Sequence, residues 1–216
     1  MSATVIWSHG KDAQPWGAKS RRMADMARQL EVEFEIVDYQ DLNDTVDAPE
    51  RRVERLLEHC ARIPGPLLLA GSSMGGYVSL CAASALRPLG VFALAPAVYL
   101  PGYGRQEFAG VECPLEVVHG WRDEVVPARN VLRLAEITRC TLHMVPDGHR
   151  LSASVERIAF WFMMFVEGVL SRATRPVAPE GLEAFAPSNQ GPCGCEPSGC
   201  EPFGSGPGRI REGDDI

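Results

Sequence analysis

A serine stands among glycines where an apolar, strand-like run gives way to a helix-like one. The run LLLA is followed by the stretch GSSMGG (71–76) and then by small residues. Glycine supplies conformational freedom that an ordinary strand-to-helix turn does not need. This indicates that Ser73 is held in a strained turn, with Gly71 and Gly75 leaving room on either side. Its hydroxyl would stand clear of the sheet at a helix N-terminus, where a developing negative charge is favoured.

An acid and a histidine follow two later strand-like runs. Asp123 lies in the stretch HGWRDEVVP, and His149 lies in the stretch PDGHRL. Ligands of an open parallel sheet gather outside the carboxyl ends of its strands, so we expect both side chains to meet Ser73 at one edge. A hydroxyl beside a base that is itself oriented by an acid can act as a nucleophile. The three residues therefore predict a site of nucleophilic catalysis.

The turn and the order of these residues resemble a known family. Residues 71–75 resemble the nucleophile elbow of the α/β-hydrolase superfamily, and the chain order Ser, Asp, His matches that family. The resemblance covers residues 3 to 170, and the chain is similar to small bacterial esterases with little or no cap. It implies that Ser73 is the nucleophile, that His149 takes its proton, and that Asp123 orients the imidazole while an acyl-enzyme forms and is hydrolysed.

The resemblance also implies an oxyanion hole. One donor would be the backbone N–H of Met74, which follows the nucleophile, and we assign the second to Lys11, which follows the first strand-like run. Asp12 takes that place if the loop is shifted by one residue. Chemistry of this kind uses no cofactor and no metal, and we expect neither.

Other residues compete for each role. Ser72 lacks the central position between the glycines, so we interpret it as a turn residue. Glu124 could replace Asp123, whereas Asp147 is expected to shape the turn before the histidine. Asp38 would serve as a displaced acid only if Asp123 were misoriented.

Several aromatic residues lie near the predicted site in the sequence. Tyr99 and Tyr103 belong to residues 96–113, which lack a helical period, and Trp121 lies beside the loop that carries the acid. We expect these three to bind substrate, although simple packing explains them equally well. Residues 96–113 form a short insertion between two predicted strands. Because this insertion is short, we expect a shallow site that favours small or exposed acyl groups.

Strand-like and helix-like runs alternate along the chain, which is typical of an α/β protein with a parallel sheet. We therefore predict a three-layer α/β/α sandwich around a mostly parallel, six-stranded sheet. The strands are expected at 3–8, 33–39, 66–71, 90–95, 115–120 and 141–146. The helices are expected at 17–30, 48–62, 76–86, 128–138 and 152–170.

The C-terminal part of the chain differs in composition. Residues 1–170 are expected to form one α/β-hydrolase domain, whereas residues 171–216 contain seven prolines and eight glycines. Such a composition is typical of a segment that cannot bury a core, so we predict a disordered tail. Its three cysteines, Cys193, Cys195 and Cys200, are too few to complete a tetrahedral metal site.

Composition limits location and partners. The net charge of −7 provides no basic patch for nucleic acid or anionic membrane, and the apolar run at 159–166 is shorter than the roughly 20 residues that cross a bilayer. The N-terminal residues lack the features of a secretory signal, and an odd number of cysteines fits a reducing compartment, so we expect a cytoplasmic protein. The helix face near Phe160 and Phe165 is where a homodimer would form.

These observations predict a serine hydrolase of carboxylic ester or thioester bonds, whose partner is a small-molecule acyl ester or thioester. Two alternatives stay open, namely a non-catalytic binding protein that keeps the fold, and a cofactor-free perhydrolase in which peroxide replaces water. The acyl chain, the leaving group and the choice among ester, thioester and amide are left undecided by the sequence. A dinucleotide site is disfavoured because the glycine spacing at 71–76 does not match that fingerprint.

Overall fold

Six parallel strands form one sheet at the centre of the structure. The computed structural model describes residues 3–45 and 48–174. The strands lie in the order β2-β1-β3-β4-β5-β6, and every neighbouring pair is parallel. Their bounds are β1 (Thr4–Ser8), β2 (Glu33–Val37), β3 (Leu67–Ser72), β4 (Gly90–Leu94), β5 (Leu115–Gly120) and β6 (Thr141–Val145). The six predicted strands are confirmed.

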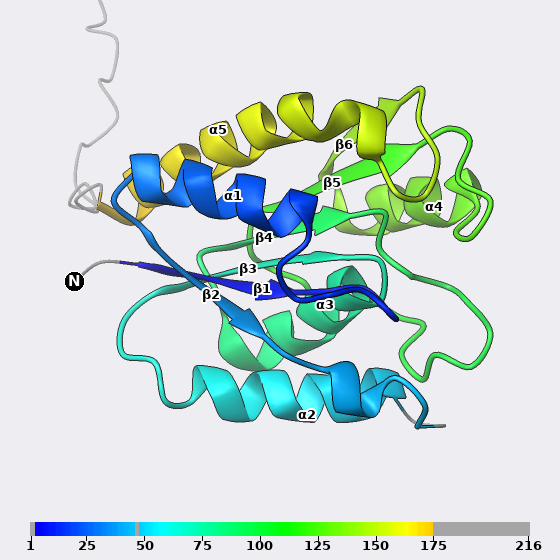
Figure 1. Ribbon diagram of the computed structural model, residues 1–216, viewed down its shortest axis with the longest axis horizontal. Coiled ribbons are helices and arrows are strands. Elements are labelled where there is room, and N and C mark those ends of the chain that lie inside the picture. Colours follow the sequence, from blue (N-terminus) through cyan, green and yellow to red (C-terminus); the bar gives the residue numbers. More distant parts are fainter. Residues whose placement is uncertain (1–2, 46–47, 175–216) are drawn as a thin grey trace, which may run out of the picture. The chain divides into compact units, whose positions relative to one another are not determined.

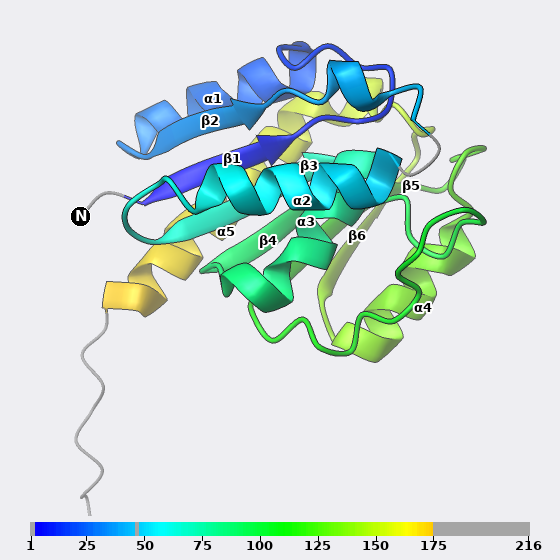
Figure 2. The same cartoon turned by 90° about the horizontal axis from the view of Figure 1, so that it is seen from below.

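Five α-helices cover the two faces of this sheet. Helices α1 and α5 pack on one face, and α2, α3 and α4 lie on the other, as Figures 1 and 2 show. Their bounds are α1 (Ala18–Gln29), α2 (Ala48–Cys60), α3 (Met74–Leu86), α4 (Ala128–Thr138) and α5 (Val155–Thr174), with short 3₁₀ helices at Gln40–Leu42 and Ser152–Ser154. The predicted three-layer sandwich is therefore confirmed.

Alternate residues of the central strands supply two apolar cores. On β3, Leu67 and Leu69 face the core shared with α2, α3 and α4, whereas Leu68 and Ala70 face the core shared with α1 and α5. All six residues of β3 are buried. Such continuous burial explains why this strand is apolar throughout, and it fixes the position from which the following turn leaves the sheet.

The last helix extends beyond the predicted end of the domain. Helix α5 continues to Thr174, four residues past the expected boundary at 170. Its buried face includes Val169, so the apolar pattern carries the helix through the point where the composition changes. The rest of the predicted tail, with Cys193, Cys195 and Cys200, lies outside the described residues.

Residues 96–113 form an irregular connection between β4 and β5, as the sequence predicts. Phe108 of this segment is fully buried. Helix α5 exposes Phe160 and Met164, which are 56% and 49% accessible, and a homodimer on this face stays a prediction. Among the described residues, the structure contains no helix with the length and apolarity that crossing a bilayer requires.

Candidate active site

Ser73 occupies a strained turn between β3 and α3. Its φ and ψ angles are 55° and −120°, a backbone conformation that residues other than glycine rarely adopt. A methyl group on Gly71 would lie 2.5 Å from the carbonyl oxygen of Gly75, and one on Gly75 would lie 2.0 Å from the carbonyl oxygen of Ser8. Only glycine fits at both positions, which is the arrangement that the sequence predicts for a nucleophile elbow.

The structure brings Ser73, His149 and Asp123 together at the carboxyl edge of the sheet. His149 follows β6, and its Nε2 atom lies 2.9 Å from Ser73 Oγ. Its Nδ1 atom lies 2.8 Å from Asp123 Oδ2. With Nδ1–H donating to the carboxylate, Nε2 is left as the acceptor for the serine proton. A hydroxyl in this arrangement has a base within proton-transfer distance.

The Asp123 carboxylate is buried and held from several sides. Its Oδ1 atom accepts hydrogen bonds from the backbone N–H groups of Val125 and Val126, at 2.9 and 2.8 Å. Burial alone would raise the pKa of Asp123, but the hydrogen bonds from His149 and from these two N–H groups outweigh it and lower the pKa. The carboxylate is therefore ionised at neutral pH and can stabilise an imidazolium.

A second histidine, His119, supports this acid. It is fully buried, its Nε2–H donates to the carbonyl of Val126 at 3.0 Å, and the same nitrogen lies 3.5 Å from Asp123 Oδ2. Burial lowers the pKa of His119, so its ring is neutral and adds no competing charge. We infer that His119 holds the loop that carries Asp123 in place.

Three backbone N–H groups near Ser73 are free to bind an oxyanion. Those of Met74 and Lys11 have no acceptor among residues 3–45 and 48–174. The loop after β1 lies against the elbow, because a methyl group on Gly10 would be 3.4 Å from Ser73 Cβ. The N–H of Asp12 is equally free within those ranges, so both predicted candidates for the second donor are retained.

A buried network fixes the loop after β1. His9 Nδ1–H donates to the carbonyl of Gly10 at 2.8 Å, and its Nε2 accepts from the backbone N–H of Tyr39 at 2.9 Å. Arg52 is fully buried, donates to the carbonyl of His9 at 3.0 Å and to the side chain of Asn43, and lies over the Tyr39 ring. Burial lowers the pKa of His9, which keeps the neutral form that this network needs.

A cavity of about 740 Å³ opens beside Ser73 and His149. Its walls come mainly from the loop after β1, from the start of α1 and from the residues around His149. Besides these, Val125 and Val155 line it. The cavity lies where a substrate carbonyl must sit in order to reach both the serine hydroxyl and the free N–H groups.

The three aromatic residues expected to bind substrate lie elsewhere. Tyr99 packs edge-on against Phe108, with the two ring centroids 5.5 Å apart, and Tyr103 packs edge-on against Tyr77 at 4.8 Å. Trp121 is exposed, and all three lie outside the cavity beside Ser73. Tyr99 and Tyr103 are partly buried and pack against the core shared with α2, α3 and α4, so core packing explains their positions.

The competing acids have other partners or positions. Asp147 accepts hydrogen bonds from the N–H groups of Gly148 and Ala153 and from the Ser154 hydroxyl, and so shapes the turn. Glu124 is exposed, and Asp38 Oδ1 accepts a hydrogen bond from the backbone N–H of Gln40. Of the carboxylates weighed in the sequence, Asp123 is the one that contacts His149.

Sequence reasoning missed Lys19 on α1. Its Nζ atom lies 3.0 Å from Ser72 Oγ and 2.9 Å from the carbonyl oxygen of Arg150, and it lines the cavity. Lys19 belongs to no motif. One feature of the sequence could have drawn attention to Lys19. The chain contains only two lysines, Lys11 and Lys19, and both lie before the end of α1.

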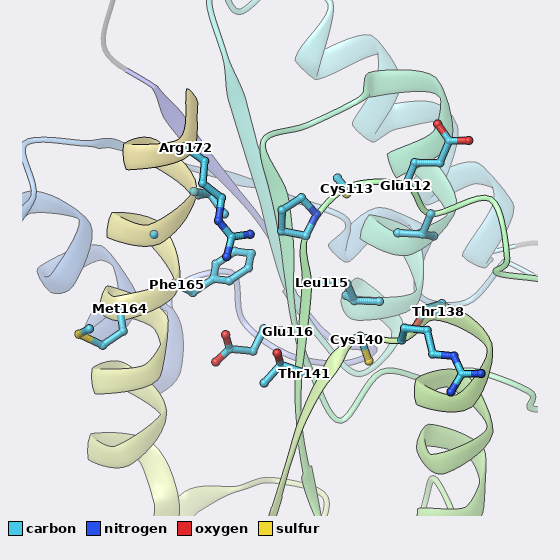
Figure 3. Close-up of a pocket in the computed structure, with 15 residues that line it drawn as sticks. Glu112, Cys113, Leu115, Glu116, Thr138, Cys140, Thr141, Met164, Phe165 and Arg172 are labelled. Carbon is cyan, nitrogen blue, oxygen red and sulfur yellow. The ribbon is translucent and has the colours of Figure 1, made fainter. Parts of the chain in front are cut away.

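A second cavity, of about 550 Å³, lies at the amino edge of the sheet, near the starts of β5 and β6 (Figure 3). Phe165 and Arg172 of α5 lie on one side of it, and Leu115 and Cys140 lie on the other. Glu116 lines it and is paired with His143 at 2.8 Å. Among the described residues, no hydrogen bond joins His143 to a serine, threonine or cysteine side chain, as one joins His149 to Ser73, so we place the candidate active site at the carboxyl edge.

Solved structures with the same fold identify the superfamily. A protein from Xanthomonas campestris pv. campestris, described as a hydrolase of the alpha/beta superfamily, matches with a TM-score of 0.71 and 29% identity over 76% of this chain and 98% of its own. The chain belongs to the α/β-hydrolase superfamily. Its strained serine turn and its Ser-Asp-His order are what that superfamily leads one to expect.

Other α/β-hydrolases share the fold at lower identity. Est1E from Butyrivibrio proteoclasticus matches with a TM-score of 0.67 and 16% identity, over 79% of this chain and 89% of its own. Alpha/beta hydrolase domain-containing protein 10 from mouse matches with a TM-score of 0.62 and 19% identity, over 79% and 90%. No protein-family model and no curated protein matches the sequence. Together these structural neighbours support a hydrolase.

Proposed function

We propose that this chain is a serine hydrolase that cleaves carboxylic ester or thioester bonds through an acyl-enzyme intermediate. The observation that carries the proposal is the continuous contact from Ser73 Oγ to His149 Nε2, at 2.9 Å, and from His149 Nδ1 to Asp123 Oδ2, at 2.8 Å. Both lengths are those of hydrogen bonds that can transfer a proton.

In the first half of the reaction, Ser73 Oγ attacks the carbonyl carbon while its proton moves to His149 Nε2. The oxyanion accepts hydrogen bonds from the N–H groups of Met74 and Lys11. His149 then gives the proton to the leaving oxygen or sulfur, and the carbon–heteroatom bond breaks. The ionised Asp123 stabilises the imidazolium throughout.

In the second half, a water molecule attacks the acyl-enzyme and gives one proton to His149 Nε2. The bond between the acyl carbon and Ser73 Oγ breaks, and the serine regains its proton from the imidazolium. The carboxylic acid leaves with the oxygen of that water. The enzyme returns to its starting state with no redox change and no consumed group.

The cavity and the structural neighbours support an ester of a small molecule as the substrate. A volume of about 740 Å³ is adequate for a small ester. Among the similar structures, Est1E has been solved with ferulic acid bound, and one other is described under the names of two lipolytic enzymes, LipS and LipT. A small-molecule ester or thioester is accordingly the partner that we propose.

A fluorophosphonate probe tests this proposal directly. It should label wild-type protein at Ser73, as mapped by mass spectrometry, and Ser73→Ala should abolish labelling and lower kcat on the order of 10⁶-fold, as in another serine hydrolase. Ser72→Ala is the matched control, because that hydroxyl lies outside hydrogen-bond contact with His149, and labelling should persist. Undiminished labelling or turnover in Ser73→Ala would refute the proposal. An acyl-length series of esters and thioesters would then define the substrate.

A further inference from the structure

Basic side chains gather in the cavity beside Ser73 although the chain is acidic. Both lysines of the sequence, Lys11 and Lys19, line this cavity, as does Arg150. Asp12 is the one carboxylate among the described residues that line it. The formal charge of the whole chain is −7. The cavity is therefore positive against the general charge of the protein.

Lys19 occupies a central position in this group. Its ammonium donates to Ser72 Oγ at 3.0 Å and to the carbonyl oxygen of Arg150 at 2.9 Å. It thus lies between the residue before the nucleophile and the residue after the base. A lysine ammonium has three N–H donors, and within residues 3–45 and 48–174 the third has no acceptor.

The charge of Lys19 is also poorly compensated. No carboxylate of the described residues forms an ion pair with it at 4.0 Å or less. Burial is the main cause that lowers the pKa of Lys19, to a net value of about 8; Asp147 and Asp123 oppose it, and the Arg150 guanidinium acts in the same direction as burial. Both of these carboxylates are already engaged by other donors, in the turn and in the contact with His149.

We propose that Lys19 binds an anionic group of the substrate, a carboxylate or a phosphate, next to the ester bond that Ser73 attacks. This rests on the proposed function and narrows its substrate class to acidic esters. The ammonium keeps most of its charge at neutral pH, and a partly buried cation without a counterion is unfavourable. An anion that accepts the third N–H removes this cost, and Lys11 and Arg150 add attraction at the rim.

The oxyanion of the reaction is a less suitable occupant. The N–H group of Met74, with that of Lys11 or Asp12, is proposed for that role, while Lys19 reaches the elbow through the side chain of Ser72. A group that stabilised only the oxyanion would act on every ester equally. A group that binds a substrate anion discriminates between charged and neutral esters, and this difference is measurable.

Three esters with a common acetyl group provide the kinetic test. They are 3-acetoxybenzoate, 3-acetoxyphenyl phosphate and the neutral 3-acetoxybenzamide, with kcat/KM measured at pH 7. We expect Lys19→Met to lower the ratio of charged to neutral kcat/KM by about tenfold to hundredfold, as for a hydrogen bond to a charged group. The charged ester that loses more identifies carboxylate or phosphate. An unchanged ratio for both would overturn the proposal.

Two further variants serve as controls. Arg21→Met removes the same charge from an exposed position on the same helix, outside the cavity, and should leave the ratio unchanged. Lys19→Arg keeps the positive charge and should retain the preference for an anion. A ratio that falls equally in Arg21→Met and Lys19→Met would assign the effect to net charge and refute the proposal.

A measurement without turnover separates this inference from the proposed function. Benzoate or phenyl phosphate should slow the reductive methylation of Lys19 in wild-type protein, mapped by mass spectrometry, whereas benzamide should not. Protection without hydrolysis of any ester would support the anion site and refute the hydrolase. Hydrolysis with equal methylation in the presence of all three ligands would do the reverse.

Discussion

The structure contains two carboxylate–histidine pairs of equal length in different surroundings. Asp123 and His149 are 2.8 Å apart at the carboxyl edge of the sheet, and Glu116 and His143 are 2.8 Å apart near the amino-edge cavity. His149 continues to the Ser73 hydroxyl. The ring of His143 instead stacks on the ring of Trp161 in α5, with the two centroids 4.1 Å apart. The group that each histidine contacts besides its carboxylate, and not the carboxylate–histidine pair itself, therefore distinguishes the candidate catalytic site.

The two acids also differ in pKa. Burial raises the pKa of Glu116 even though His143 donates to it, whereas hydrogen bonds lower the pKa of Asp123. Backbone N–H donors around Asp123 make this difference. The two cavities are also of comparable size, so volume alone does not locate the chemistry.

The largest contrast is expected from removing the charge of each acid in turn. Asp123→Asn should lower kcat on the order of 10⁴-fold, as in serine proteases, because the amide stabilises the wrong tautomer of the histidine. Glu116→Gln alters the other pair and should leave kcat unaffected. Hydrolysis of p-nitrophenyl acetate measures both, and equal losses in the two variants would contradict the assignment.

A smaller contrast, in the free energy of unfolding, is expected between alanine substitutions at two glycines, one near each cavity. Gly75→Ala places a methyl group 2.0 Å from the carbonyl oxygen of Ser8, so it should destabilise the fold by about 3 kcal/mol or more. Gly168 lines the amino-edge cavity on α5 and has no atom within 4 Å of an added methyl group. Gly168→Ala should stabilise by roughly 0.5–1 kcal/mol through helix propensity. Urea unfolding midpoints compare the two, and a Gly75→Ala protein as stable as wild type would show that the elbow relaxes.

The smallest effect concerns the pH dependence of stability at Lys19. The pKa of Lys19 is lowered to about 8 in the folded protein, against 10.5 as its ordinary value. Between these values the unfolded chain binds more protons, so stability rises with pH. Lys19→Met should therefore be more stable than wild type below pH 8 and should lose this advantage as the pH rises toward 10.5. Thermal unfolding across that range tests it, and a constant difference would contradict the desolvated ammonium.

The sequence predicted the features that repeat along the chain or that only glycine can satisfy. Alternation of apolar runs located all six strands, because a buried parallel strand is apolar throughout. The glycines around Ser73 predicted its strained turn, since a methyl group on either Gly71 or Gly75 meets backbone. Parallel topology then placed Asp123 and His149 at the same edge.

Features that depend on long-range packing were not predictable in the same way. Whether Tyr99 lines a cavity or closes the core depends on its contact with Phe108 and on the Arg133 guanidinium, which lies 4.1 Å from the Tyr99 ring centroid. Lys19 becomes important only because α1 passes the elbow, and no local pattern encodes that approach. The end of α5 at Thr174 follows from burial of Val169, which overrides the change in composition.

The hydrogen bond from the Tyr39 N–H to His9 ties the proposed oxyanion loop to the margin of the sheet. Tyr39 follows β2, which has a neighbour on one side only. Terminal strands open at lower free energy than central ones, so fraying there reaches the loop without passing through Ser73. We therefore expect the proposed hydrolase activity to be lost on warming before circular dichroism reports a loss of secondary structure.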